Sequence, residues 1–333
     1  MGRISHIAAA LTAILISGAC QKATDIPKSE GRLIEVPLSL CVMDMEHNVD
    51  TKATEPYIPD YENLIYDIWV LQYSSRGVLL SSTVNRYRAS EAGVTKVNDL
   101  KVTLRESAED CTVCLLVNLG EDPLLGAAWP DNLDTYRRTM IPIGMMSNGQ
   151  ADNGLKMPMN GFYKGPVPPR SSSATGSLNG GDYSGSLNVS LGRMLCRINV
   201  VLNNALVTEG YTTITGLDVE IENVPDKSHL LPTINYVMPD KSIMGRLEDS
   251  VQLTLEKGES TVLYYYMAPN LYSYEEGGTD SRTKLNISAM IQGIGVRSGT
   301  VILGNDPPSM DARDYRLYPN NQYTFTINLR NDH

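Results

Sequence analysis

Two cysteines three positions apart, Cys111 and Cys114, form the one Cys-x-x-Cys pair of the chain. On a helix or in a knuckle this spacing is typical of redox chemistry or of a zinc site. Here the pair lies in the apolar run 111–117, which is typical of a buried strand, and residues three apart on a strand point to opposite faces. We therefore interpret both thiols as small buried hydrophobic groups. Because sequence gives no connectivity, a disulfide stays open among Cys41, Cys111, Cys114 and Cys196.

The other groups that could carry catalysis are scattered along the chain. No histidine lies at ligand spacing from the cysteines, and we interpret those outside the leader as surface residues; the four are His6, His47, His229 and His333. Motifs of serine hydrolases, zinc proteases and phosphate-binding loops are missing from the sequence. Carboxylates gather between Glu275 and Asp280, but without the spacing of a known Ca²⁺ site. We expect no catalytic residue, metal or cofactor, and therefore no enzyme.

A fifth cysteine, Cys20, ends a different pattern. Arg3 precedes an apolar run from Ile7 to Ile16, and three small residues follow it. This is a secretory signal, because the run is too short to span a bilayer. A cysteine directly after small residues is typical of a bacterial lipobox, although Ser17 stands where leucine is usual. We expect cleavage before Cys20 and a lipid on its thiol that tethers the protein to a membrane; the alternative is an ordinary signal peptide with a chance cysteine.

Charge and length narrow the classes of function. The chain carries 28 Lys plus Arg against 38 Asp plus Glu, a net charge of -10. An acidic chain binds polyanions poorly, so we expect no nucleic acid partner. Once residues 1–19 are removed as a signal peptide, the remaining length suits two ordinary domains.

The elements that must position these residues are short strands. Apolar residues alternate with polar ones, or run together where both faces are buried, in segments separated by turn residues. The predicted strands are 33–43, where Pro37 marks an edge position, 64–73, 78–80, 100–104, 111–117, 194–202, 213–224, 251–255, 261–267, 284–291, 299–303 and 323–329. One stretch, 122–140, is persuasively helical. The pattern predicts an all-β chain of two antiparallel β-sandwiches in tandem.

A change in composition divides the chain. Proline, serine and glycine dominate residues 166–186, and such a stretch buries too little apolar surface to order itself. We therefore predict a linker over 171–185, between an N-terminal sandwich over 33–170 and a C-terminal sandwich over 186–333. The polar residues 20–32 are expected to form a tether.

Several short motifs, in order along nearly the whole chain, together resemble the fimbrillin family, the lipoprotein precursors of type V pili in Gram-negative anaerobes. The residues that carry the resemblance are Cys20, Asp67–Tyr73 with Gly77, Val113–Asn118 with Gly120, Ile143–Gly161, Leu191–Ile198, Tyr264–Asn270 and Leu317–Tyr323. The resemblance implies two transthyretin-like β-sandwich domains and a surface-exposed outer-membrane location. It also implies assembly with other pilin subunits by strand exchange, and adhesion to a host or bacterial surface.

The family's processing can be carried over to two positions of this chain. The removable first strand corresponds to 33–43, and the basic residue in the loop after it is Lys52, where the best-known members have arginine. Arg32 precedes the strand, so cleavage there releases only the tether. Because the sequence ends four residues after Leu329, with no evident spare strand to donate, a tip, accessory or anchor role stays open beside a stalk role.

The alternative function is a surface lipoprotein that binds glycan. Sugar-binding sites use aromatic platforms, and the candidates are Tyr272 and Tyr274 beside the acidic loop, together with Trp129. Packing at the edge of a sandwich is the competing interpretation and the one we favour for these aromatic residues.

Overall fold

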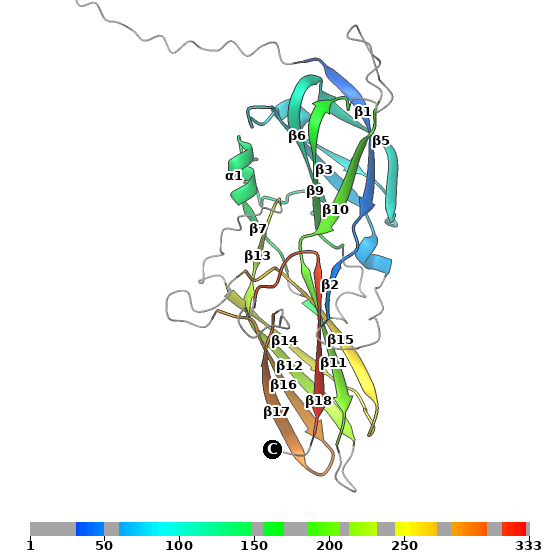
Figure 1. Cartoon of the computed structure of the whole chain (residues 1–333), viewed down its shortest axis with the longest axis vertical. Helices are drawn as coiled ribbons and strands as arrows, with labels where there is room; N and C mark the ends of the chain where they lie inside the picture. Colours follow the sequence, from blue (N-terminus) through cyan, green and yellow to red (C-terminus); the bar gives the residue numbers. More distant parts are fainter. Residues whose placement is uncertain are drawn as a thin grey trace, which may run out of the picture.

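The computed structural model describes residues 31–49, 60–144, 146–147, 156–169, 185–206, 213–231, 244–271, 281–304 and 315–330. Within these residues nearly all regular structure is β, arranged in four sheets. Figure 1 shows two β units placed end to end along the long axis of the molecule. None of the helices in this part of the chain has the length and apolarity needed to cross a bilayer.

The upper unit in Figure 1 is built from one seven-stranded sheet. In spatial order its strands are β4 (Asn85–Arg88), β3 (Asp67–Tyr73), β6 (Ser107–Val117), β9 (Met159–Val167), β10 (Leu187–Arg193), β1 (Leu33–Val42) and β5 (Lys96–Arg105). The sheet curls so that its last strand returns to β3: Gln72 Nε2 donates to Arg105 O at 2.8 Å, and Arg105 N donates to Gln72 Oε1 at 2.7 Å. The curled sheet encloses a first hydrophobic core that includes Leu38, Leu71 and Leu115.

The lower unit is a sandwich of two sheets over a second hydrophobic core. One sheet has the order β2 (Glu46–Val49), β18 (Asn321–Leu329), β11 (Cys196–Asn204), β15 (Ser260–Met267) and β8 (Met146–Ser147). The other has the order β14 (Met244–Val251), β12 (Ile214–Pro225), β16 (Lys284–Ile291) and β17 (Gly295–Ile302). Alternate residues of both sheets point into this core, among them Ile198, Val219 and Ile287.

Small elements complete the structure. Strands β7 (Met140–Pro142) and β13 (Lys227–His229) pair with each other, and η1 (Asp60–Asn63) and η2 (Ser81–Thr83) are single 3-10 turns. The helix α1 (Leu133–Arg138) lies inside the predicted helical stretch. Its N-cap is Asn132, whose side chain accepts from Thr135 N at 2.8 Å.

The all-β prediction is confirmed, but the details differ. Strands β2, β4, β7, β8, β9, β10 and β13 lie outside the predicted strands. Strand β1 pairs in parallel with β10, and β18 pairs in parallel with both β11 and β2, so these sheets are mixed rather than antiparallel. All three parallel pairs join strands that are far apart in the sequence, where no hairpin dictates direction. A strand was predicted over 251–255, but β14 ends at Val251, where that strand was to begin. The residues of β14 are charged or half-exposed, so an apolar pattern does not identify this edge strand. In the predicted return strand 78–80, Val78 and Leu79 form only isolated bridges, with Asn132 and Tyr73.

The chain leaves the first core and enters the second at a position that follows the predicted linker. Strand β10 follows the predicted linker, yet Leu187, Val189 and Leu191 are buried in the first core. Only Met194 and Leu195 separate β10 from β11, which lies in the other unit. An alternating pattern identifies a buried face but not the core that buries it. The domain boundaries given from the sequence stay predictions.

Both thiols of the Cys-x-x-Cys pair are buried on β6. The four cysteines within the described residues are free, and Cys41 on β1 is the exposed one among them. Burial raises the pKa of the Cys111 and Cys114 thiols, which favours their neutral form.

Candidate functional site

Residues 33–49, called here the N-terminal segment, run through both β units. Their first part, β1, lies between β10 and β5 in the seven-stranded sheet, and their last part, β2, pairs with the start of β18 in the lower sandwich. Figure 1 shows the segment passing along the molecule from the upper unit into the lower one. A single stretch of chain therefore supplies a strand to each unit.

Strand β1 is held by its neighbours and by the first core. Val36, Leu38 and Leu40 alternate inward and are almost fully buried, which places apolar side chains of the segment inside the core. Its register with β5 runs from Leu33↔Arg105 to Cys41↔Lys96. Among the described strands β5 pairs with β1 alone, so β1 connects β5 to the rest of the sheet.

Pro37 marks the point where β1 changes from one strand partner to two. It pairs with Lys101 of β5, while pairing with β10 begins at the next residue, Leu38. Its carbonyl accepts from Ser186 Oγ at 3.1 Å in place of a strand partner. A proline lacks the N–H that a second ladder would use, which suits this position.

The crossing between β1 and β2 is held through its main chain. Met43 N donates to Leu191 O at 2.8 Å. Arg193 Nη1 donates to Met43 O at 2.9 Å, and Asn320 Nδ2 donates to Asp44 O at 3.0 Å. Arg193 is 3% exposed, so its guanidinium is shielded from water, whereas the contact of Asn320 with Asp44 O is exposed.

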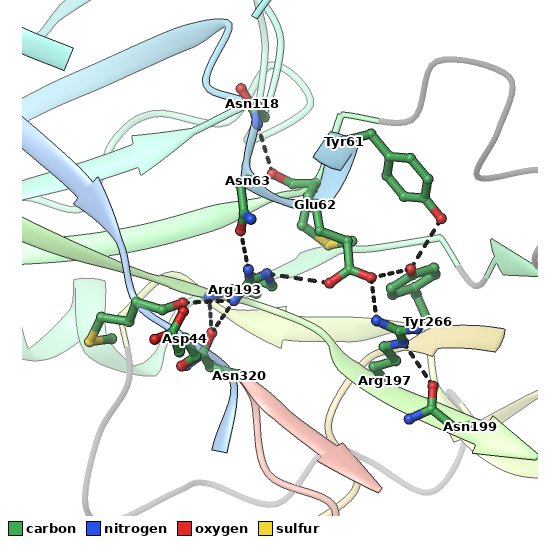
Figure 2. Close-up of polar contacts among 12 residues, drawn as sticks. Asp44, Tyr61, Glu62, Asn63, Asn118, Arg193, Arg197, Asn199, Tyr266 and Asn320 are labelled. Carbon is green, nitrogen blue, oxygen red and sulfur yellow. Dashed lines mark hydrogen bonds and ion pairs between the residues drawn. The ribbon is translucent and has the colours of Figure 1, made fainter. Parts of the chain in front are cut away.

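A buried network of charged and polar side chains surrounds this crossing, and we call it the junction network (Figure 2). Glu62 of η1 is its centre: its Oε1 accepts from Arg197 Nη1 at 2.9 Å and from Tyr266 Oη at 2.5 Å, and its Oε2 lies 3.9 Å from Arg193 Nε. Arg197 Nε donates to Asn199 Oδ1 at 2.8 Å. Paired and hydrogen-bonded charges tolerate burial, whereas removing one partner leaves an uncompensated charge.

The network ties the two units together. Glu62 and Arg193 belong to segments at the end of the upper unit, while Arg197 on β11 and Tyr266 on β15 belong to strands of the lower sandwich. The guanidinium of Arg197 also stacks on the Tyr264 ring, 4.3 Å from its centroid. Burial lowers the pKa of Arg193 and Glu62 opposes that change. Burial, with the charge of Glu62, raises the pKa of Tyr266 and keeps its hydroxyl a donor.

The site residues predicted from the sequence lie outside the described residues. These are Cys20, Lys52, Tyr272 and Tyr274, so lipidation, processing and glycan contact stay predictions. Lys52 follows β2 by three positions and precedes η1. Trp129 packs against Trp69, with ring centroids 5.3 Å apart, instead of standing free as a platform.

The prediction that His229 is a surface residue is wrong. It is 5% exposed, because β13 carries it into the pairing with β7, and its Nδ1 lies 3.2 Å from Arg137 O. Within the described residues no group of three or more His, Cys, Asp or Glu side chains could hold a metal ion.

The junction network was not predicted from the sequence. The signal available was two arginines, Arg193 and Arg197, inside an otherwise apolar run. A charge at a buried strand position requires a partner. Nothing in the local pattern identifies that partner as Glu62, which is more than 130 positions away from Arg197.

No protein-family model and no curated protein sequence matches the chain. Solved structures do match: a proposed cell adhesion protein from Parabacteroides distasonis has a TM-score of 0.56 at 17% identity, with 90% of each chain covered.

Two further matches come from Porphyromonas gingivalis. The tip fimbrial protein Mfa3, solved with a C-terminal truncation, has a TM-score of 0.53 at 14% identity and covers 89% of this chain and 96% of its own. A fimbrilin, fimA, has a TM-score of 0.52 at 12% identity and covers 88% and 90%. The two β units of this chain therefore have the fold found in fimbrillins, as the sequence resemblance implies.

Proposed function

We propose that this chain is a structural or adhesive subunit of a cell-surface pilus, exported as a lipoprotein and assembled by strand exchange. The observation that carries the proposal is the path of the N-terminal segment, which supplies β1 to the upper sheet and β2 to the lower one. Cleavage after Lys52 separates both strands from the rest of the chain in one step. The fimbrial proteins of similar fold support the same assignment.

Loss of the N-terminal segment leaves a site that fits an extended strand. The strands β5 and β10 lose the main-chain partner that lies between them, and inward positions opposite Val36, Leu38 and Leu40 lose their apolar contacts. A strand from another subunit satisfies the backbone donors and acceptors together with the apolar pockets.

The far edge of that site has contacts that survive the loss of β1. Gln72 on β3 keeps both hydrogen bonds to Arg105, and Thr103 N donates to Tyr87 Oη of β4 at 2.7 Å. These contacts hold β5 against β3 and β4. The groove therefore keeps two walls for an incoming strand instead of closing over the exposed core.

Mass spectrometry of protein purified from the cell surface tests this function. A mature chain that starts at Ala53, found in high-mass polymers on partially denatured gels, is the expected result. A Lys52→Ala variant should accumulate as an unprocessed, non-polymeric chain, with Arg32→Ala as the matched control that still polymerises. Polymers built from chains that keep residues 33–52 would contradict strand exchange, and an acylated Cys20 on such chains would indicate an anchor.

A further inference from the structure

Two side-chain donors of the junction network end on the main chain of the N-terminal segment. They are Arg193 Nη1, which contacts Met43 O at 2.9 Å, and Asn320 Nδ2, which contacts Asp44 O at 3.0 Å. Both acceptors are consecutive carbonyls at the crossing between β1 and β2. The side chain of Met43 is 43% exposed, so its identity contributes little at this point.

The two donors are positioned entirely by residues that stay when the segment leaves. Asn320 Oδ1 accepts from Arg193 N at 3.0 Å and from Arg193 Nη1 at 3.1 Å, and Asn320 N donates to Leu195 O at 2.9 Å. Arg193 Nη2 donates to Asn63 Oδ1, and Glu62 Oε2 lies 3.9 Å from its Nε. Asn320 has φ of 56°, a conformation that asparagine adopts more readily than most residues.

When the segment leaves, Arg193 Nη1 keeps its contact with Asn320 Oδ1 but loses Met43 O, and Asn320 Nδ2 loses Asp44 O. Arg193 is buried, and a buried charged donor that loses an acceptor is unfavourable. Main-chain carbonyls are the acceptors that any extended chain offers, whatever its sequence. The geometry therefore selects for a chain that crosses between the two sheets with two consecutive carbonyls turned toward Arg193 and Asn320.

Resting on the proposed function, we propose that Arg193 and Asn320 form a carbonyl clamp that holds the main chain of a strand donated by another subunit where it crosses between the two sheets. The clamp contacts the backbone at the crossing, while the pockets along β1 accept alternate side chains. A slip by one residue would offer other carbonyls to the clamp but would turn apolar side chains away from the core, so the pockets set the register. The clamp thus adds binding that does not depend on the side chains of the donated strand.

The test uses the full chain with a protease site inserted after Lys52, cut once so that the N-terminal fragment stays bound without a covalent link. We measure the rate at which the fragment leaves and the affinity for a fluorescent peptide of residues 31–49. In Asn320→Asp the side chain keeps its shape and its contact with Arg193, but a carboxylate oxygen replaces the donor that faces Asp44 O. We expect fragment loss at least tenfold faster and peptide binding at least tenfold weaker.

A control peptide and a second variant separate the clamp from general damage. A peptide carrying Met43→Ala should bind wild-type protein within twofold of the original peptide, because the carbonyl is kept. Arg193→Lys keeps the charge beside Glu62 but loses the fork, and should weaken peptide binding as Asn320→Asp does. Hydrogen exchange of β11 and β15 verifies that each variant is folded.

Equal binding by wild type and both variants, or failure of wild-type protein to bind the peptide at all, would overturn the clamp. The assay does not depend on natural processing, because the protease site is inserted. Surface polymers that keep residues 33–52 would therefore overturn the proposed assembly while leaving the clamp measurement valid.

Discussion

The two stretches of chain on either side of residues 50–59 are held in different ways. After them, η1 is fixed by side chains: Glu62 reaches Arg197 and Tyr266, and Asn63 reaches Arg193. Before them, the N-terminal segment is held by strand pairing, by carbonyl contacts at its crossing and by alternating apolar side chains. Specific charged pairs require one sequence, whereas main-chain contacts accept many strands. The difference fits the proposal that η1 remains in the mature chain and that the N-terminal segment is replaced.

The largest effect is expected on the stretch that remains. Glu62→Gln removes the charge that pairs with buried Arg197, and breaking a buried ion pair costs about 3–5 kcal/mol of unfolding free energy. Urea unfolding measures this loss. The matched control is Glu121→Gln, whose side chain is 90% exposed beside Arg86 and whose loss should cost less than about 1 kcal/mol. Equal effects of the two substitutions would show that the buried ion pair of Glu62 stabilises the protein no more than an exposed one.

A somewhat smaller effect is expected on the segment itself. Leu38 is fully buried on β1, and Leu38→Ala should lower the unfolding free energy by about 2–5 kcal/mol. Leu33, which is 48% exposed on the same strand, serves as the control, and Leu33→Ala should change the unfolding free energy by about 0.5 kcal/mol or less. In chains cut after residue 52, Leu38→Ala should also speed release of the fragment. Indistinguishable variants would show that β1 does not contribute to the first core.

A third prediction concerns alkaline pH. Burial raises the pKa of the Cys196 thiol to about 12 and raises those of Cys111 and Cys114. An unfolded thiol loses its proton near pH 8.5, so between about pH 9 and 12 the folded state binds more protons and the unfolding free energy falls as pH rises. The loss is about 2 kcal/mol per thiol at pH 10.

Urea unfolding midpoints at pH 8, 9 and 10 test this dependence. Because none of the three thiols lies on the N-terminal segment, the decline should persist after the segment is released. Cys196→Ala should make the decline less steep, because one of the three buried thiols is removed. A stability that rises between pH 8 and 10 would contradict the burial of these thiols.

The smallest expected effect concerns chemical labelling of the exposed and buried cysteine thiols. Cys41 on β1 is exposed, and Cys196 on β11 is buried in the second core. A maleimide should modify Cys41 in the native protein within minutes and leave Cys196 unmodified until urea is added, as peptide mass mapping would show. Rapid modification of Cys196 in native protein would mean that the lower sandwich opens readily.

How much of this could be predicted depends on whether the information is local. The buried strand with Cys111 and Cys114, the strand that begins at Leu33 and the edge character of Pro37 all follow from patterns within a few residues. Local patterns report spacing and polarity, and these elements depend on little else.

What could not be predicted depends on distant partners. The alternation in β10 shows a buried face, but its core is chosen by pairing with β1, about 150 residues earlier. Likewise the side chains that satisfy Arg193 come from Glu62, Asn63 and Asn320. Such pairs are set by topology, and a single sequence does not display them.

Hydrogen exchange at β5 tests the central claim most directly, because among the described strands β5 pairs with β1 alone. We would measure it in the intact chain, after cleavage and release of residues up to Lys52, and in the assembled polymer. We expect the β5 amides that face β1 to be protected in the intact chain, to lose protection on release and to regain it in the polymer. Protection that stays unchanged on release, or that does not return in the polymer, would contradict strand exchange at this site.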